Sequence, residues 1–98
     1  MTKEDILHYL STHKDEFYRK FNITKLALFG SYARGDATES SDIDILVEIE
    51  KDTQNIHDKK EAFRALIENA LHKRVDIARE KYLKPLAREA IEKDICYV

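Results

Sequence analysis

The chain of 98 residues is the size of one small domain, so we expect a single domain over residues 1–98 and no second hydrophobic core. Apolar residues make up 43% and charged residues 37%, with only two glycines and one proline, and this composition excludes a disordered chain. The formal net charge of −2 excludes the concentrated positive field that general nucleic-acid binding needs. We therefore expect a compact, helix-rich protein without a direct nucleic-acid partner.

The sequence predicts neither a membrane segment nor a secretion signal. The longest apolar runs are far below the roughly 20 residues that cross a bilayer, and the N-terminus is polar and charged. The single cysteine, Cys96, has no partner for an internal disulfide. These features predict a cytoplasmic protein with no membrane association.

The first half of the chain predicts a helix followed by two strands. Apolar residues at helical intervals predict one helix over residues 3–20, which Thr2 and Asp5 begin with capping-box spacing. Residues 25–29 form a short apolar run that stops at a glycine, as in a strand covered on both faces inside a sheet. Residues 42–50 alternate between apolar and mostly acidic positions, which predicts a second strand with one buried face. The buried set is Ile43, Ile45, Val47 and Ile49.

The second half predicts a helix, a short strand, a last helix and an edge strand. One apolar stripe runs along a helix over about residues 58–72, residues 74–78 form a third strand, and residues 95–98 add a terminal edge strand. Pro85 suits the first turn of a final helix. We expect this helix to turn four apolar residues inward: Leu86, Ala87, Ala90 and Ile91. The alternation of strands and helices predicts an α/β (α+β) fold, with a small mixed sheet of three to four strands flanked by helices.

Asp42 and Asp44 stand one position apart at the start of the second predicted strand. Because side chains alternate along a strand, both carboxylates leave the same face, about 7 Å apart at the typical rise of roughly 3.3 Å per residue. Two acids this close repel each other, and a proton or a cation between them relieves the repulsion. Oxygen-only ligands favour Mg²⁺ or Mn²⁺ over zinc. The alternative is that the two acids form only the solvated face of an amphipathic strand.

A third acid, Asp76, lies between two apolar residues of the third predicted strand. If that strand lies beside the second, Asp76 points to the same side as Asp42 and Asp44. A lone acid in a strand usually only faces solvent, so a functional role for Asp76 requires that it lie close to Asp42 and Asp44. Together the three acids are the candidate catalytic and metal-binding residues.

Gly30 and Ser31 follow the first predicted strand, at a point where a short helix can begin. Glycine lets a phosphate approach the backbone closely, and the amides and the hydroxyl that follow can donate to its oxygens. Alternatively, the glycine only forms a turn and the serine only caps a helix. Arg34 lies one helical turn beyond Ser31, where it either reaches phosphate oxygens or pairs with Asp36 or Glu39.

A glycine-serine pair, ten further residues, an Asp-x-Asp pair and a later acid in a short strand resemble the signature of the DNA polymerase beta-like nucleotidyltransferase superfamily. Here these positions are Gly30, Ser31, Asp42, Asp44 and Asp76. Over nearly its whole length the chain also looks similar to minimal nucleotidyltransferases of the MntA type. The resemblance implies the nucleotidyltransferase fold, in which Gly30 and Ser31 bind the triphosphate of ATP. It also implies that Asp42 and Asp44 hold two Mg²⁺ ions and that Asp76 completes one of the two sites.

The same resemblance implies a function in a toxin–antitoxin pair. The antitoxin of such a pair transfers AMP from ATP to a tyrosine of a HEPN-domain toxin RNase, so we expect a HEPN-domain partner and a hetero-oligomer. Two alternatives stay open, which are a nucleotidyltransferase that acts on a small molecule and a non-catalytic antitoxin that neutralises its toxin by binding. The short chain leaves no additional region for binding a small acceptor, which favours a protein substrate.

Overall fold

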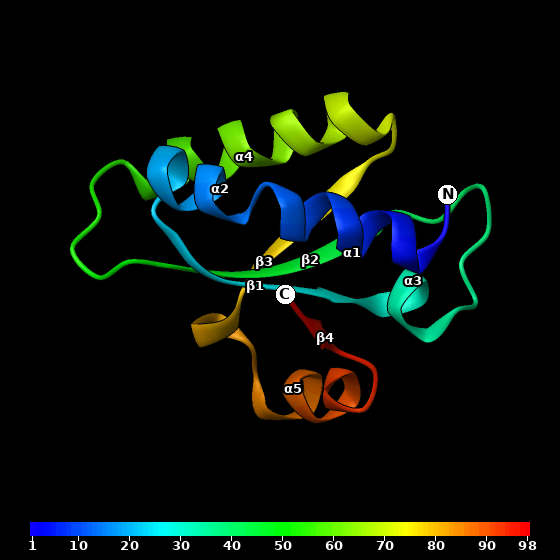
Figure 1. The fold of residues 1–98 in the computed structure, drawn as a ribbon. Coiled ribbons are helices and arrows are strands. Elements are labelled where there is room, and N and C mark those ends of the chain that lie inside the picture. The colour runs from blue at the N-terminus through cyan, green and yellow to red at the C-terminus, as the bar shows by residue number, and fades with distance from the viewer.

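A four-stranded sheet with the strand order β3-β2-β1-β4 forms the centre of the fold (Figure 1). The computed structural model describes all 98 residues. The elements in chain order are α1 (Lys3–Thr12), α2 (Lys14–Phe21), β1 (Ile23–Phe29), α3 (Gly30–Arg34), β2 (Ile43–Ile49), α4 (Ile56–Leu71), β3 (Val75–Arg79), the 3₁₀ helix η1 (Glu80–Tyr82), α5 (Pro85–Glu92) and β4 (Cys96–Tyr97). The predicted mixed sheet flanked by helices is confirmed. None of these helices combines the length and the apolar composition that crossing a membrane requires.

The strand pairing brings two of the candidate acids side by side. β1 and β2 run antiparallel, β2 and β3 run parallel, and the short β4 pairs antiparallel with the outer edge of β1. A parallel pair needs a crossover connection, which α4 supplies between β2 and β3. β1 therefore lies inside the sheet, as its apolar run predicts, and Asp44 of β2 is registered with Asp76 of β3.

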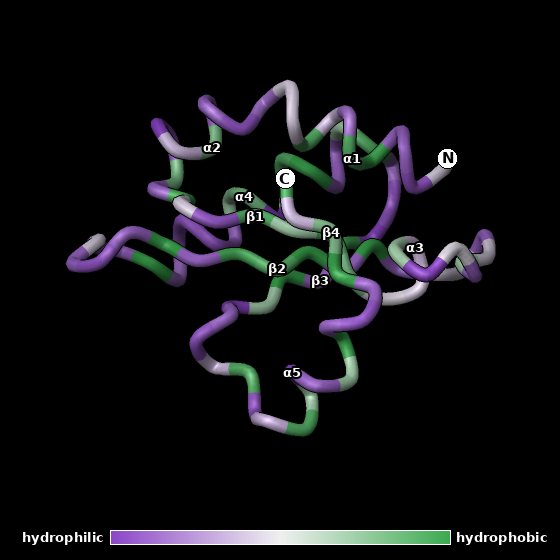
Figure 2. Tube along the Cα trace, turned by 60° about the horizontal axis from the view of Figure 1, so that its bottom comes forward, coloured by the Kyte–Doolittle hydropathy of each residue, from purple (hydrophilic) through white to green (hydrophobic).

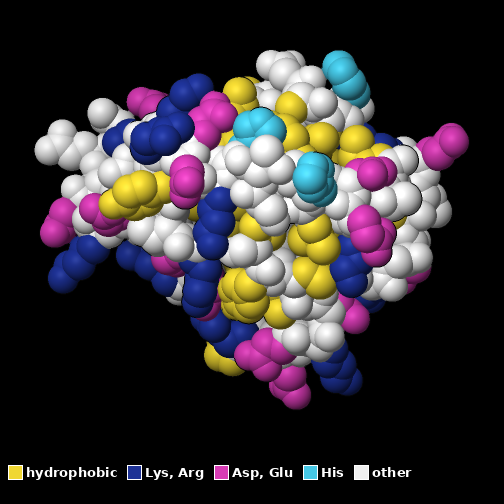
Figure 3. Space-filling view, viewed as in Figure 1, with side chains coloured by type: hydrophobic (Ala, Val, Ile, Leu, Met, Phe, Trp, Pro, Cys, Tyr) yellow, Lys and Arg dark blue, Asp and Glu magenta, His cyan; other side chains and the backbone are white.

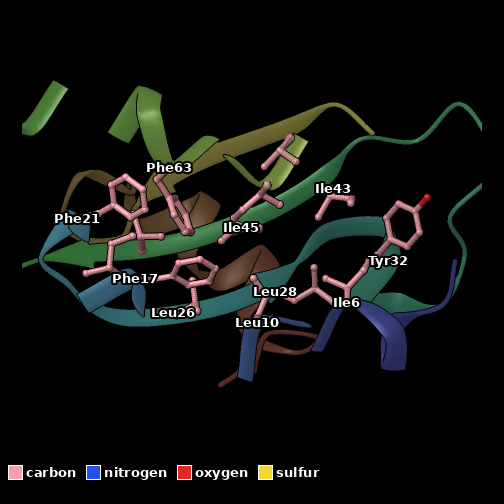
Figure 4. Close-up of a cluster of buried hydrophobic side chains, with 14 of the residues drawn as sticks. Ile6, Leu10, Phe17, Phe21, Leu26, Leu28, Tyr32, Ile43, Ile45 and Phe63 are labelled. Carbon is pink, nitrogen blue, oxygen red and sulfur yellow. The ribbon is translucent and has the colours of Figure 1, made fainter. Parts of the chain in front are cut away.

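Helices α1, α2 and α4 lie together over one face of the sheet, which we call the helix-covered face (Figure 1). Its core contains the predicted apolar residues of β2 and phenylalanines from the helices (Figure 4). Phe63 of α4 meets Phe17 and Phe21 of α2 edge-on, with ring centroids 4.9 and 5.6 Å apart. The alternate residues of β2, among them Asp44 and Leu46, point to the opposite face, which we call the open face.

The N-terminal part forms two helices instead of the single helix expected over residues 3–20. The break lies at His13, which has φ −104° and ψ 10°. Thr12 Oγ1 donates to the His8 carbonyl over 2.8 Å, and His13 Nδ1 lies 2.9 Å from the Tyr9 carbonyl. These side chains compete with backbone amides for the helix carbonyls, which weakens the helix at this point. The predicted N-terminal capping box is present.

The last helix, α5, begins at Pro85 as predicted, but the expectation that its apolar residues face inward is wrong. No residue of α5 is buried, Leu86 is 81% exposed, Ala87 and Ala90 are exposed, and Ile91 is half-buried. In Figure 1 α5 lies beyond the open face, away from the three packed helices, and the trace in Figure 2 has hydrophobic (green) positions in this outlying part. A helical period predicts which residues share a face. It does not predict whether the chain supplies a second surface to cover that face.

Candidate active site

Asp44 lies at the centre of an acidic group on the open face. It is half-buried on β2, it is registered with Asp76 on β3, and Asp42 lies two residues earlier in the chain. Burial raises the pKa of the Asp44 carboxyl, and the charges of Asp76 and Asp42 raise it further. The positive charge of Arg34 acts in the opposite direction. The structure therefore brings the three candidate acids into one neighbourhood.

Gly30 lies against Asp44 at the junction between β1 and α3. The strand register pairs Phe29, the last residue of β1, with Asp44. Gly30 has a φ of +76°, and a Cβ at this position would collide with the Asp44 carboxylate. Only a residue without a side chain lets the backbone turn this close to the acid. Ser31 follows directly, so the predicted phosphate-binding turn adjoins the acids.

Arg74, which the sequence reasoning did not single out, reaches one of the acids. Its Nε lies 3.0 Å from Asp42 Oδ1, and its side chain is 78% exposed. The two residues meet because the Ile43 amide, directly after Asp42, donates to the Arg74 carbonyl over 2.9 Å. An ion pair as exposed as this one contributes little to stability. The sequence shows only that a basic residue precedes the strand that carries Asp76. That this residue reaches Asp42 could be predicted only with knowledge of the parallel pairing of β2 and β3.

Arg34 pairs with Asp36, which is one of its two predicted alternatives. The distance from Arg34 Nε to Asp36 Oδ2 is 3.2 Å, and both side chains are largely exposed. The effect of Arg34 on the pKa of Asp44 places its charge in the surroundings of the acids. Its contact with a phosphate stays a prediction.

The candidate donors suit a hard divalent cation, although they do not form a ready set of ligands. No group of three or more His, Cys, Asp or Glu side chains is arranged to hold a metal ion. Every candidate donor is nevertheless a carboxylate oxygen, which Mg²⁺ prefers. A cation among the acids would also offset the repulsion that raises the pKa of Asp44. The residues fit Mg²⁺ by their chemistry, and the ion pair with Arg74 occupies only one carboxylate oxygen of Asp42, Oδ1.

The acids lie on an open surface and not in a cavity. The largest hollow of the molecule, about 780 Å³, lies at the other end of β2, where Glu48, Ile49 and Glu50 line it. Neither this hollow nor the two smaller ones include any of the three acids. A small acceptor would therefore find little enclosure here, because small-molecule sites bury most of their ligand.

The family comparison agrees with the fold. The nucleotidyltransferase domain family matches residues 10–98, and the chain belongs to this family. The protein is therefore a nucleotidyltransferase.

Two relatives span nearly the whole chain. A Methanocaldococcus jannaschii protein, provisionally named as a protein adenylyltransferase, is 36% identical over 98 residues, which cover 99% of this chain and 98% of the relative. Protein adenylyltransferase MntA of Thermococcus cleftensis is 34% identical over 98 residues, which cover 100% of this chain and 97% of the relative. The similarity thus extends over the full length of both relatives.

Solved structures share the fold. A structure provisionally described as a minimal nucleotidyltransferase superimposes with a TM-score of 0.78 at 28% identity, covering 98% of this chain and 95% of the other. A chain from a crystal structure of a toxin–antitoxin with AMP-PNP gives a TM-score of 0.67 at 22% identity, covering 88% of this chain and 69% of the other. At that identity the second likeness concerns the fold alone.

Proposed function

We propose that this nucleotidyltransferase transfers AMP from ATP to a tyrosine of a HEPN-domain toxin RNase, and that it is the antitoxin of this partner. Full-length similarity to protein adenylyltransferases supports AMP transfer to a protein. The observation that carries the proposal is the placement of three acids on adjacent strands beside the Gly30 turn.

The open surface around the acids supports a protein acceptor. None of the hollows includes the acids, so the chain does not itself enclose a second small substrate. A protein acceptor brings its own surface, and it can cover the acids while it presents a hydroxyl group to them. We infer that the reactive site is completed only in a complex with the acceptor.

The reaction joins the phenolic oxygen of the acceptor to the α-phosphorus of ATP. The bond from this phosphorus to the oxygen that bridges to the β-phosphorus breaks, and pyrophosphate leaves with the electron pair. The turn at Gly30 and Ser31 would position the triphosphate, because glycines in general let phosphate oxygens approach the backbone and Ser31 offers an amide and a hydroxyl. Tyrosine has an ordinary pKa of about 10, so the phenol needs a base at neutral pH. Asp76, which is exposed beside Asp44, would accept the phenolic proton.

Asp42, Asp44 and Asp76 would hold two Mg²⁺ ions, which when bound supply positive charge to the triphosphate. The pKa of Asp44 is raised, first by burial and then by the other acids. A proton therefore competes with the cation at this residue. We expect the affinity for Mg²⁺ to fall as the pH decreases, and a titration with Mn²⁺ as a probe at several pH values measures this.

The direct test is incubation of the purified chain with α-labelled ATP, Mg²⁺ and the protein encoded next to it, which we expect to be a HEPN-domain protein. The label is expected on a tyrosine of the partner, and Asp42→Asn and Asp44→Asn are each expected to abolish it while the fold is retained. Asp52→Asn is the matched control, because Asp52 is an exposed acid in the turn after β2. Undiminished labelling of the partner by either site variant would refute the assignment.

Neutralisation by binding alone is the competing explanation. The double variant Asp42→Asn/Asp44→Asn separates the two explanations. Loss of neutralisation with binding retained supports transfer. Undiminished neutralisation of the RNase at equal concentration supports simple covering of its active site.

A further inference from the structure

An apolar surface near η1 and α5 is left uncovered by the rest of the chain. Tyr82 of η1 is 68% exposed, and Leu86 of α5 is 81% exposed. Tyr82 also borders a hollow of about 400 Å³ at the β3 edge of the sheet, formed by side chains from α4, β3 and η1. The apolar lining of this hollow is Ile56, Ala78, Tyr82 and Leu83. We call the hollow together with Leu86 the η1–α5 surface.

Side-chain hydrogen bonds, the pairing of β4 with β1 and the packing of Cys96 and Val98 against the core attach this part of the chain to the sheet. Glu80 accepts a hydrogen bond from Lys25 of β1 over 3.1 Å and one from the Tyr97 hydroxyl of β4 over 3.5 Å. Arg88 of α5 donates to the Glu80 carbonyl over 3.1 Å. Because these bonds connect η1, α5 and β4 to β1, the exposed apolar residues are not needed for the attachment. They remain available to another molecule.

The η1–α5 surface adjoins the acids. Ala78, in the lining of the hollow, is two residues from Asp76 on β3, so both side chains leave the same face about 7 Å apart at roughly 3.3 Å per residue. Ala78 is registered with Leu46 just as Asp76 is registered with Asp44. The hollow lies at the β3 edge between α4 and η1, so a protein segment seated in it could continue along β3 from Ala78 toward Asp76.

Positive charge surrounds the apolar residues. Lys81 Nζ lies 5.2 Å from the centroid of the Tyr82 ring, and Lys84 is exposed at the start of α5. The lining of the hollow includes Lys60 and Arg79 and no acid. Glu48 binds Arg79 over 2.8 Å and Glu80 binds Lys25, while Glu89 and Glu92 of α5 are exposed. Figure 3 shows Lys and Arg side chains gathered in the part of the molecule where η1 lies in Figure 1. The surface thus fits a partner with an apolar anchor and acidic residues around it.

We propose that the η1–α5 surface is the docking site for the acceptor protein, which binds through an acidic segment with an apolar anchor and so brings its hydroxyl group to the acids. The proposal rests on the proposed function, because it needs a protein acceptor. A second copy of this chain fits less well. A two-fold contact through this surface would bring Lys81 and Lys84 of both copies into one interface, which doubles its positive charge.

The test compares exposed residues on and off the surface, with the HEPN-domain protein as the probe. Tyr82→Ser and Leu86→Ser remove apolar groups from the surface, and Tyr18→Ser is the matched control because Tyr18 on α2 is 49% exposed. Lys84→Glu reverses a charge on the surface, and Lys14→Glu makes the same change at the exposed start of α2. Circular dichroism and ATP affinity establish that each variant keeps its fold.

Calorimetric titration with the probe, without ATP, measures the affinity of each variant. The affinities of Tyr82→Ser and Leu86→Ser are expected to fall about tenfold or more, and both controls are expected to bind as the wild type does. Lys84→Glu is expected to weaken binding several-fold at low salt and less at high salt. With ATP present, the surface variants raise KM for the acceptor and leave kcat unchanged. Equal affinities for Tyr82→Ser and Tyr18→Ser, or a dimer of the chain alone that Leu86→Ser dissociates, would overturn the docking proposal.

Failure of the docking site and failure of the proposed function give different results. If the probe binds in the predicted order but receives no AMP, docking stands and transfer is refuted. If the wild type labels the probe while all surface variants keep the wild-type KM, transfer stands and this docking site is refuted. A probe that does not bind the wild type at all refutes both.

Discussion

The two faces of the sheet differ in what holds them together. The helix-covered face is packed by side chains that are almost completely buried, among them Phe17, Phe63 and Ile45. On the open face, Asp44 carries a raised pKa, and polar contacts around Glu80 help to attach the C-terminal part. One face therefore supplies most of the stability, and the other is free to hold repelling charges and uncovered apolar groups. The predictions below test this division, from the largest expected effect to the smallest.

Phe63→Ala on the helix-covered face is expected to give the largest loss of stability. Phe63 is fully buried and contacts two other aromatic rings, so the free energy of unfolding should fall by about 3–5 kcal/mol. Leu86→Ala on α5 is expected to change it by about 0.5 kcal/mol or less, because Leu86 is mostly exposed. Urea unfolding of both variants measures the contrast. Similar losses for the two would contradict the division between the faces.

Alanine substitutions at the two glycines distinguish the cost of backbone strain from the cost of a collision with Asp44. Gly30→Ala places a Cβ into the Asp44 carboxylate and also strains a φ of +76°, so a loss of about 2–4 kcal/mol is expected together with loss of AMP transfer. Gly35→Ala meets no neighbouring atom at a φ of +85°, so only about 1 kcal/mol of strain is expected. Thermal unfolding of the two variants gives the comparison. Equal melting temperatures would show that the space beside Asp44 is not restricted.

Glu80→Ala tests the attachment of the C-terminal part. The variant removes the acceptor that Lys25 and Tyr97 share, so residues 83–98 should exchange their amide hydrogens faster while the strands β1 and β2 keep their protection. The loss in overall stability is expected to be about 1 kcal/mol or less, because the partners Lys25 and Tyr97 are about half exposed to water. Hydrogen exchange measured by mass spectrometry resolves the two regions. Unchanged exchange in residues 83–98 would show that apolar packing holds them.

Asp44→Asn is expected to stabilise the fold slightly while it abolishes the activity. Burial and the neighbouring acids raise the pKa of Asp44 above its ordinary value of 3.8, so the folded state holds the proton more tightly than the unfolded state. Stability from this group is therefore present at low pH and is lost as the pH rises through the raised pKa. The variant should melt on the order of a degree or two higher than the wild type at neutral pH, and no higher below pH about 3. A lower melting temperature at neutral pH would contradict this account of Asp44.

Local patterns predicted the elements and the grouping of the acids. The alternation along β2 predicted which residues are buried and that Asp42 and Asp44 leave the other face, and the apolar run of β1 predicted a strand inside the sheet. Asp76 was correctly expected near them if β3 lay beside β2, which the parallel register confirms. These features depend on period and chain order, which a sequence carries directly.

The features that were missed depend on contacts between distant parts of the chain. The close approach of Gly30 to Asp44 follows from the register of Phe29 with Asp44. The ion pair between Arg74 and Asp42 follows from the parallel pairing of β2 with β3. The break at His13 reflects side chains that compete for backbone carbonyls within an otherwise helical pattern. The apolar stripe of α5 was predicted as a stripe, but its exposure depends on how much of the chain is left to cover it.

The most direct test of the central claim is a single-turnover reaction with α-labelled ATP, Mg²⁺ and the HEPN-domain protein, in which labelled acceptor and pyrophosphate are both quantified. For the wild type we expect equal amounts of transferred AMP and released pyrophosphate, with the label on tyrosine. For Asp44→Asn we expect both to fall by about a hundredfold or more, while the variant still binds the acceptor. An Asp44→Asn variant that labels the acceptor at the wild-type rate would contradict the claim that these acids carry out AMP transfer.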